Sequence, residues 1–241
     1  MAPAALSIVV PAFNEAGRLP VTLPAFAAFC ESRGATDVLV VNDGSVDDTR
    51  DVLDAFSRRH PAVRAMHNPT NHGKGYALRQ GVLHSRGEWV LVTDADLSTP
   101  LEDIDRLFEA VAASGALIAV GSRAVDRSLV GVRQSAPREW SGRFFNVVMR
   151  TVTGLPFRDT QCGFKLYRRD AATIVFSRQR LHGFGSDVED LVIAGSQGLR
   201  AVEVPVHWNN VEGTRVGALS GGRAFADLLV VRWHQLRGRY R

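Results

Sequence analysis

The sequence predicts an α/β fold, in which a mostly parallel sheet carries helices on both faces. Two observations lead to this prediction. Short β-branched apolar runs alternate with amphipathic stretches along residues 1–122, which is typical of repeated strand–helix units. Several of these runs also end abruptly in small or acidic residues. Ligands of such sheets bind outside the carboxyl ends of the strands, so we expect the chemistry of this protein there.

The expected elements of this first part follow in chain order. Strands are expected at residues 6–10, 38–41, 63–66, 89–92 and 117–120. Helices are expected between them at residues 19–33, from 47 or 48 to 59, 75–86 and 101–113. In the helix at 19–33, for example, Leu19, Leu23 and Phe26 recur at the spacing that places them on one face.

The pattern changes after Arg123. Residues 124–138 have no clear period and contain Gly131 and Pro137, so a mobile loop is expected there. Further elements are expected as a helix at 139–153, a strand at 164–167, a helix over 187–194, a strand at 201–208 and a last helix at 222–237. Asp187, Glu189 and Asp190 open the helix at 187–194, where interaction with the helix dipole explains them as well as catalysis does.

The last helix is amphipathic. Its expected apolar face consists of Phe225, Leu228, Leu229, Trp233 and Leu236, and arginines surround that face. Such a pattern suits a helix lying in a membrane interface, and it equally suits a helix packed on the core of the domain.

Length and composition exclude several classes of protein. The chain has 241 residues, of which 45% are hydrophobic and 22% charged, so a disordered or fibrous chain is excluded. Cys30 and Cys162 are too few for a disulfide framework or a structural zinc site, which indicates a reducing, cytoplasmic environment. No apolar run approaches the roughly 20 residues that a membrane-spanning helix needs.

Charge is distributed unevenly along the chain. Residues 1–122 carry ten basic and fifteen acidic side chains, whereas residues 123–180 carry twelve basic and four acidic ones. A basic segment of this kind favours a polyanionic partner such as nucleic acid, phospholipid head groups or a phosphorylated substrate. Almost every basic residue is an arginine, and the two lysines are Lys74 and Lys165.

Two aspartates spaced two residues apart directly follow the strand at 89–92. A pair such as Asp94 and Asp96 can hold a hard divalent cation together with substrate phosphates. Asp103 and Asp105 repeat the spacing, but they fall inside an expected helix, where we interpret them as part of a solvated face.

Lys74 is expected at a helix N-terminus, where its charge opposes the helix dipole. That position makes sense if an anion lies nearby; a surface lysine in a glycine-rich turn is the alternative. The flanking Gly73 and Gly75 do not complete a phosphate-binding P-loop, and no Gly-x-Gly-x-x-Gly follows the first strand.

Six segments together resemble glycosyltransferase family 2. They are IVVPAFNEA (8–16), VVNDGSVDDT (40–49), NHGKGYALRQG (71–81), VTDADLSTP (92–100), GSR (121–123) and DTQCGFKLY (159–167). Within that family they most resemble polyprenyl-phosphate sugar transferases of the dolichyl-phosphate glucosyltransferase type; a polyprenyl-phospho-N-acetylgalactosaminyl synthase is a second candidate. The resemblance covers about residues 6–212.

The resemblance implies a single domain with the Rossmann-like GT-A fold over residues 1–241. Its parts would be a nucleotide-sugar half at 1–122, an acceptor half at 123–220 and a C-terminal amphipathic helix at 221–241. The implied reaction is the inverting, metal-dependent transfer of N-acetylgalactosamine or glucose from a UDP-sugar to polyprenyl phosphate, for cell-envelope glycan synthesis. The implied cofactor is Mg²⁺ or Mn²⁺.

Alternatives to this reaction stay open. A family 2 enzyme could instead use GDP-mannose, or a soluble acceptor such as a sugar or glycerate. A non-catalytic module that binds an anionic surface is suggested by the basic segment alone. The acidic strand ends count against that module because they would repel a polyanion, and we expect no nucleic-acid partner.

The resemblance also assigns residues to the donor. The implied nucleotide-sugar site comprises Pro11, Phe13, Glu15, Asp43, Lys74, Asp94 and Ala95. Asp43 would face the uracil or the ribose. Asp96 would ligate the cation that bridges the diphosphate, with Asp94 and Gln161 as further candidate ligands.

On the acceptor side the resemblance implies catalytic roles for Arg123, Asp159 and Gln161. A family-based interpretation makes Asp159 the general base. A phosphomonoester, with a second pKa of about 6, is already largely dianionic at neutral pH, so we expect Asp159 to orient the acceptor or its arginine partners; helix capping is the alternative. Because arginines bind phosphate bidentately, the candidate acceptor-phosphate ligands are Arg133, Arg138, Arg143 and Arg215.

A lipid-phosphate acceptor would bring the protein to a membrane. We expect peripheral attachment to the inner face of the plasma membrane, on the cytoplasmic side. Since the interfacial helix alone would attach weakly, we expect a small membrane protein to recruit the chain.

Overall fold

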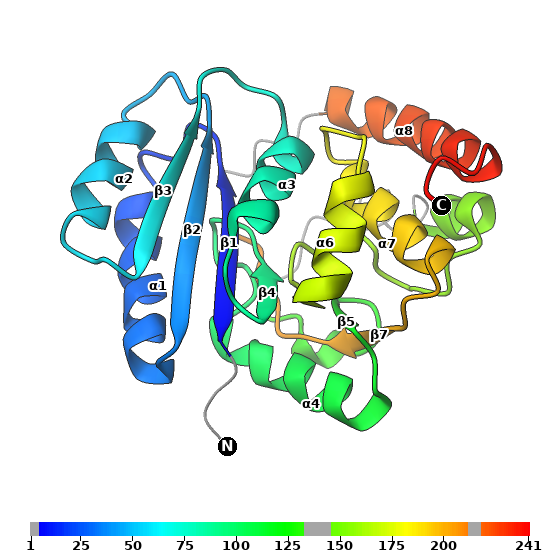
Figure 1. Cartoon of the computed structure of the whole chain (residues 1–241), viewed down its shortest axis with the longest axis horizontal. Coiled ribbons are helices and arrows are strands. Elements are labelled where there is room, and N and C mark those ends of the chain that lie inside the picture. The colour runs from blue at the N-terminus through cyan, green and yellow to red at the C-terminus, as the bar shows by residue number, and fades with distance from the viewer. Residues whose placement is uncertain (1–4, 133–145, 212–217) are drawn as a thin grey trace.

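The computed structural model describes residues 5–132, 146–211 and 218–241. In this part of the chain, one sheet contains seven strands in the order β3-β2-β1-β4-β6-β5-β7 (Figure 1). The strands are β1 (Leu6–Ala12), β2 (Thr36–Asp43), β3 (Val63–Asn68), β4 (Trp89–Val92), β5 (Ile118–Ser122), β6 (Lys165–Arg168) and β7 (Ala201–Pro205).

Six of these strands point the same way, which confirms the expected mostly parallel sheet. β1 pairs in parallel with β2 and β4, β2 with β3, and β5 with β7. β6 is antiparallel to both of its neighbours, β4 and β5. The segments before and after residue 122 therefore share one sheet, because β6 lies between two strands of the first segment.

Helices cover both faces of the sheet (Figure 1). They are α1 (Leu19–Arg33), α2 (Thr49–Ser57), α3 (Lys74–His84), α4 (Ile104–Ser114), α6 (Arg169–Arg178), α7 (Ser186–Ser196) and α8 (Ala218–Leu236). Residues 146–153 are also helical. Most buried apolar side chains fall into one core with α1, α2 and α4 and a second with α3, α6, α7 and α8, and Leu39, Val41 and Ala77 form a small third cluster.

Alternation along β1 shows how the two cores share a strand. Ile8 and Val10 belong to the core that contains Phe26 of α1, whereas Val9 between them belongs to the core that contains Leu78 of α3. This is the two-residue period of a strand buried on both faces.

Two expectations need correction. Helix α6, Arg169–Arg178, was not expected. It follows β6 directly, and the residue before it, Arg168, is not a side-chain cap that would indicate a helix start. The strand expected at 201–208 ends at Pro205, because its partner β5 ends at Ser122.

The expected loop at 124–138 is described only as far as residue 132. Arg127–Leu129 form a short 3-10 turn, and the Asp126 side chain accepts a hydrogen bond from the Ser128 amide at 2.9 Å. Of the helix expected at 139–153, residues 146–153 are described and are helical. Among the described residues, no helix has both the length and the apolar character needed to cross a bilayer.

Candidate active site

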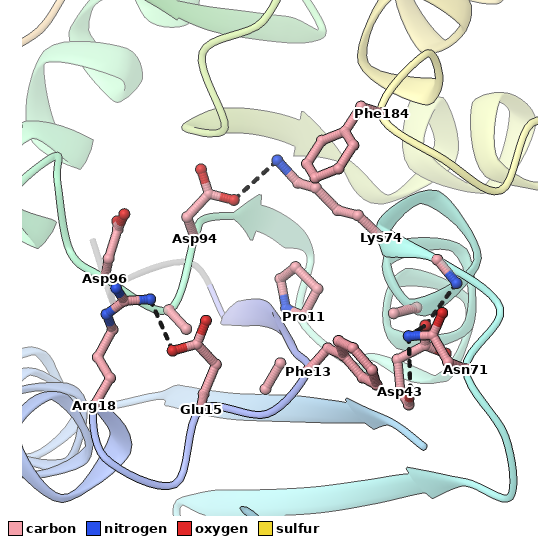
Figure 2. A pocket seen from close by; sticks show the side chains of 14 residues that line it. Pro11, Phe13, Glu15, Arg18, Asp43, Asn71, Lys74, Asp94, Asp96 and Phe184 are labelled. Carbon is pink, nitrogen blue, oxygen red and sulfur yellow. Dashed lines mark hydrogen bonds and ion pairs between the residues drawn. The ribbon is translucent and has the colours of Figure 1, made fainter. Parts of the chain in front are cut away.

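A cleft of about 340 Å³ opens at the carboxyl ends of β1, β2 and β4 (Figure 2). Its lining consists of Pro11, Ala12, Phe13, Glu15, Arg18, Asp43, Asn71, Gly73, Lys74, Ala77, Asp94, Ala95, Asp96 and Phe184. Every residue that the resemblance assigned to the nucleotide sugar lines this cleft, and so does Asp96. Segments far apart in sequence meet here because parallel strands end at the same edge of a sheet.

Asp43, at the end of β2, holds one wall of the cleft. Its Oδ2 accepts hydrogen bonds from the backbone amides of His72 (3.0 Å) and Gly73 (2.6 Å) and from the Asn71 side chain (3.1 Å). Its Oδ1 accepts one from the Asn68 side chain (2.8 Å). Both oxygens are thus engaged with the protein, and a contact from Asp43 to the uracil or ribose stays a prediction.

Amide groups at the N-terminus of α3 are hydrogen-bonded to a backbone carbonyl of another segment. The His182 carbonyl accepts hydrogen bonds from the amides of Gly75 (2.7 Å) and Tyr76 (3.2 Å). Gly73 has φ +109°, and a Cβ there would come within 2.5 Å of that carbonyl oxygen, so glycine is required on both counts. These two amides are occupied, and Lys74 provides positive charge to the cleft through its side chain.

Lys74 lies between two carboxylates. Its Nζ is 2.9 Å from Asp94 Oδ1 and 3.4 Å from Asp187 Oδ2. Burial alone would lower the pKa of Lys74, but these two carboxylates raise it above its usual range, so the ammonium is charged at neutral pH. Figure 2 shows the Lys74–Asp94 pair inside the cleft.

Asp94 and Asp96 come from the turn after β4 and present two hard oxygen ligands to the cleft (Figure 2). Asp96 Oδ1 also accepts a hydrogen bond from the Ser98 amide at 2.9 Å. In the described ranges, no group of three or more His, Cys, Asp or Glu side chains could hold a metal on its own. Mg²⁺ uses one or two carboxylates plus phosphates and water, so this pair fits a cation that shares its ligands with a bound diphosphate.

The second Asp-x-Asp pair has a different role from the one expected. Asp103 is buried, and its carboxylate accepts hydrogen bonds from the backbone amide of His207 and contacts the ring of the same residue. Asp105 is exposed and pairs with Arg33 at 2.7 Å. The solvated face expected for both residues holds only for Asp105.

Asp159 forms a bidentate ion pair with Arg123. Arg123 Nε donates to Oδ2 at 2.6 Å and Nη2 to Oδ1 at 2.8 Å. Burial alone would raise the pKa of Asp159, but the Arg123 guanidinium and its hydrogen bonds hold that pKa below its usual range. Arg123 also lies over the Trp208 ring, 5.4 Å from its centroid. Asp159 lies in a loop and caps no helix.

Arg123, Asp159 and Gln161 do not belong to the lining of the cleft, but their segment borders it. A side chain at Gly163 would overlap the Asp94 carboxylate. The Gln161 amide donates to Asp159 Oδ1 at 3.2 Å, while metal ligation by its side chain stays a prediction. The four candidate acceptor-phosphate arginines, Arg133, Arg138, Arg143 and Arg215, lie outside the described residues.

Sequence reasoning missed three polar or aromatic side chains of the cleft. Arg18 pairs with Glu15 at 2.7 Å, and its position three residues after Glu15 could have suggested this. Asn71 belongs to the segment 71–81, in which the resemblance assigns a role to Lys74 and not to the asparagine. Phe184 comes from the loop before α7, far from any motif, and no pattern in the sequence marks it.

The profile of glycosyl transferase family 2 matches residues 7–175. The chain belongs to this family. It is therefore a glycosyltransferase, and the non-catalytic module considered from the basic segment is set aside.

Curated relatives match almost the whole chain. Dolichyl-phosphate beta-glucosyltransferase ALG5A of Trichomonas vaginalis is 35% identical over 240 residues, which cover 94% of this chain and 72% of the relative. The human dolichyl-phosphate beta-glucosyltransferase is 35% identical over 252 residues, which cover 98% and 77%. The yeast protein of that name is 30% identical, covering 98% and 76%.

Solved structures of other proteins share the fold. Glucosyl-3-phosphoglycerate synthase of Mycobacterium tuberculosis with phosphoglyceric acid superposes with a TM-score of 0.70 at 20% identity, covering 95% of this chain and 80% of that one. Its complex with Mn²⁺, UDP-glucose and phosphoglyceric acid gives 0.67 at 19% identity with the same coverage. These likenesses confirm the expected GT-A fold.

Proposed function

We propose that this glycosyltransferase transfers glucose from UDP-glucose to polyprenyl phosphate. One observation carries the proposal: the cleft gathers Lys74, Asp94 and Asp96 at the sheet edge of a chain that is 35% identical, over 94% of its length, to a dolichyl-phosphate beta-glucosyltransferase. N-acetylgalactosamine is the second sugar to test, because it differs from glucose by few substituents.

The cleft suits a nucleoside diphosphate sugar. Pro11 and the half-exposed ring of Phe13 offer an apolar surface on which a base can stack. The Lys74 ammonium stabilises negative charge that develops on the leaving diphosphate. Asp94 and Asp96 would hold Mg²⁺ or Mn²⁺, which when bound supplies Lewis-acid stabilisation of the same charge.

The acceptor phosphate acts as the nucleophile. One of its oxygens forms a bond to the anomeric carbon while the bond to the UDP oxygen breaks and its electron pair leaves with UDP, which inverts the configuration. The acceptor needs no base, and Asp159 is a poor one because two N–H groups of Arg123 occupy its oxygens. We assign Asp159 to positioning Arg123, whose guanidinium compensates the charge of a phosphate.

The test is transfer of radiolabelled sugar into organic-extractable lipid. Purified protein, short-chain polyprenyl phosphate and Mg²⁺ or Mn²⁺ are incubated with UDP-glucose, UDP-N-acetylgalactosamine or GDP-mannose. We expect label from UDP-glucose in the organic phase, abolished by EDTA. Label from another donor would show that the transferred sugar is not glucose. Turnover only on soluble acceptors such as glycerate or free sugars would contradict polyprenyl phosphate as the acceptor.

The C-terminal helix offers a surface for the membrane. One side of α8 packs on the core through Leu228 and Val231, whereas Leu229, Trp233 and Leu236 on the other side are 66%, 43% and 71% exposed. The single apolar face expected for this helix is thus divided: Leu228 packs on the core, whereas Leu229, Trp233 and Leu236 are exposed. The guanidinium groups of Arg237 and Arg239 lie over the Trp233 ring, which places positive charge beside the apolar stripe.

We propose that this stripe rests on the anionic inner face of the plasma membrane. Sedimentation with vesicles containing an anionic phospholipid tests it: Leu229→Ser with Leu236→Ser should reduce binding, whereas Val21→Ser, an exposed valine on α1, should not. Complete binding of the pure protein would make a recruiting membrane protein unnecessary. Absence of binding would overturn direct docking and leave recruitment as the route.

A further inference from the structure

The only two lysines of the sequence meet at one carboxylate. Asp187, at the start of α7, accepts Lys165 Nζ at 2.5 Å on Oδ1, and its Oδ2 lies 3.4 Å from Lys74 Nζ. Lys165 in β6 is completely buried and Asp187 is 5% exposed, so this pair lies behind the cleft. In a chain whose other basic residues are all arginines, two lysines at one acid mark a place that needs a compact charge.

The two carboxylates beside Lys74 differ in how freely they can leave it. The side chain of Asp94 is 43% exposed and faces the cleft, where donor and cation would compete for it. The Asp187 side chain is buried and is held on its other oxygen by Lys165. A cation or a hydroxyl group of an arriving donor could therefore draw Asp94 away from Lys74, whereas Asp187 would stay in place.

We propose that Asp187 is a positioning residue, which holds the Lys74 ammonium at the donor diphosphate once Asp94 has turned to the donor. Lys165 has a distinct part in this arrangement. Its charge balances the single negative charge of Asp187, which leaves the charge of Lys74 free to act on the donor. The inference rests on the proposed UDP-sugar donor and extends it to residues outside the lining of the cleft.

Asp190 provides a matched comparison on the same helix. It is as deeply buried as Asp187, but its Oδ1 has no hydrogen-bond partner among the described residues and no ion pair joins it to Lys74. Burial, with the nearby carboxylates of Asp187 and Glu189, raises the pKa of Asp190 well above its usual range. Asp190→Asn keeps the size and shape of the side chain and has no ion pair with Lys74 to lose, so it controls for altered packing of α7.

Titration calorimetry with UDP and with uridine, in the presence of Mg²⁺, tests the proposal. Lys74 acts on the diphosphate and not on the nucleoside, so Asp187→Asn and Lys74→Met should each weaken UDP about tenfold and leave uridine unchanged. Because Asp187 acts through Lys74, adding Asp187→Asn to Lys74→Met should weaken UDP no further. Asp190→Asn should bind both ligands as the wild type does.

Other outcomes overturn the idea. Equal weakening of uridine and UDP by Asp187→Asn would show a structural role, and additive losses in the double variant would show that Asp187 does not act through Lys74. Asp187→Asn leaves Lys165 buried without its partner; if it fails to fold, Asp187→Asn with Lys165→Met removes both charges and should still weaken UDP selectively. Wild-type protein that binds no UDP would instead contradict the proposed donor.

Discussion

The ends of β2 and β4 lie at the same edge of one sheet, and both carry aspartates that line the cleft. Asp43, after β2, is 2% exposed and its carboxylate accepts four hydrogen bonds from the segment 68–73. Asp94, after β4, is far more exposed and has Lys74 as its partner. One carboxylate builds the wall of the site, while the other faces what the site binds.

The difference lies in what the neighbouring segment offers. Beside Asp43, the end of β3 and the turn before α3 offer two backbone amides and two asparagine side chains, so the carboxylate is satisfied without a ligand. Beside Asp94 lies Gly163, where any side chain would overlap the carboxylate, so this segment offers Asp94 no side-chain partner. An aspartate at a strand end can therefore be assigned to ligand binding only after the protein groups that donate hydrogen bonds to its carboxylate have been identified.

The largest effect should come from Asp96→Ala. It removes a carboxylate that would hold the cation but contributes little to the wall, so activity should fall about 10³-fold with an unchanged melting temperature. Initial rates over a Mg²⁺ titration measure this. Asp105→Ala, in the second Asp-x-Asp pair, is the control and should keep full activity; equal losses in both variants would remove the distinction between the pairs.

The next largest loss of activity is expected from Asp159, which forms an ion pair with Arg123 outside the cleft. Asp159→Asn frees Arg123 from its bidentate partner, so activity should fall about 10²-fold, with a higher KM for the acceptor. Asp170→Asn breaks a similar pair with Arg168 on the surface and should be silent. A loss below about tenfold for Asp159→Asn would exclude a role in the reaction.

Asp43→Asn should reduce stability more than activity, whereas Asp96→Ala should reduce activity and leave stability unchanged. The amide cannot accept all four hydrogen bonds, so the free energy of unfolding should fall by about 2 kcal/mol, while activity falls less than in Asp96→Ala. Urea denaturation measures it, with the exposed Asp48→Asn as control. Unchanged stability together with lost UDP binding would make Asp43 a ligand of the donor.

The smallest effect is a pH dependence of stability. The folded-state pKa of Asp159 lies below its unfolded value near 3.8, so its contribution is present above that pH and is lost as pH falls through the folded-state pKa. The difference in stability between wild type and Asp159→Asn should stay constant from pH 7 to about 4 and shrink below it. A difference that shrinks already between pH 7 and 5 would contradict the lowered pKa.

Much of the fold could be predicted because the period of the apolar residues is strong. The strand ranges 38–41, 63–66 and 89–92 all lie within observed strands. The direction of β6 and the existence of α6 could not be predicted. A four-residue strand such as Lys165–Arg168 shows no direction in its sequence. Helix α6 follows that strand without an intervening loop and without a side-chain cap, so the helical spacing of Ala171, Ala172, Val175 and Phe176 is the one signal for it.

The site divides in a similar way. Residues directly after strands, such as Asp94 and Asp96, could be placed from the sequence because their neighbours in the chain fix them. Asp187 and Phe184 could not, since only the packing of α7 against α3 brings them to Lys74. The burial of Asp103 was missed because its partner, His207, lies about a hundred residues away.

The antiparallel strand also fixes an order of assembly during synthesis. β1, β2, β3 and β4 pair among themselves as they emerge from the ribosome, but the outer edge of β4 and both edges of β5 stay open until Lys165–Arg168 and then β7 have been made. An open strand edge is a template for pairing with another chain. The nascent protein therefore exposes these three edges while residues 123–164 are being made, and pausing before β6 would prolong that exposure.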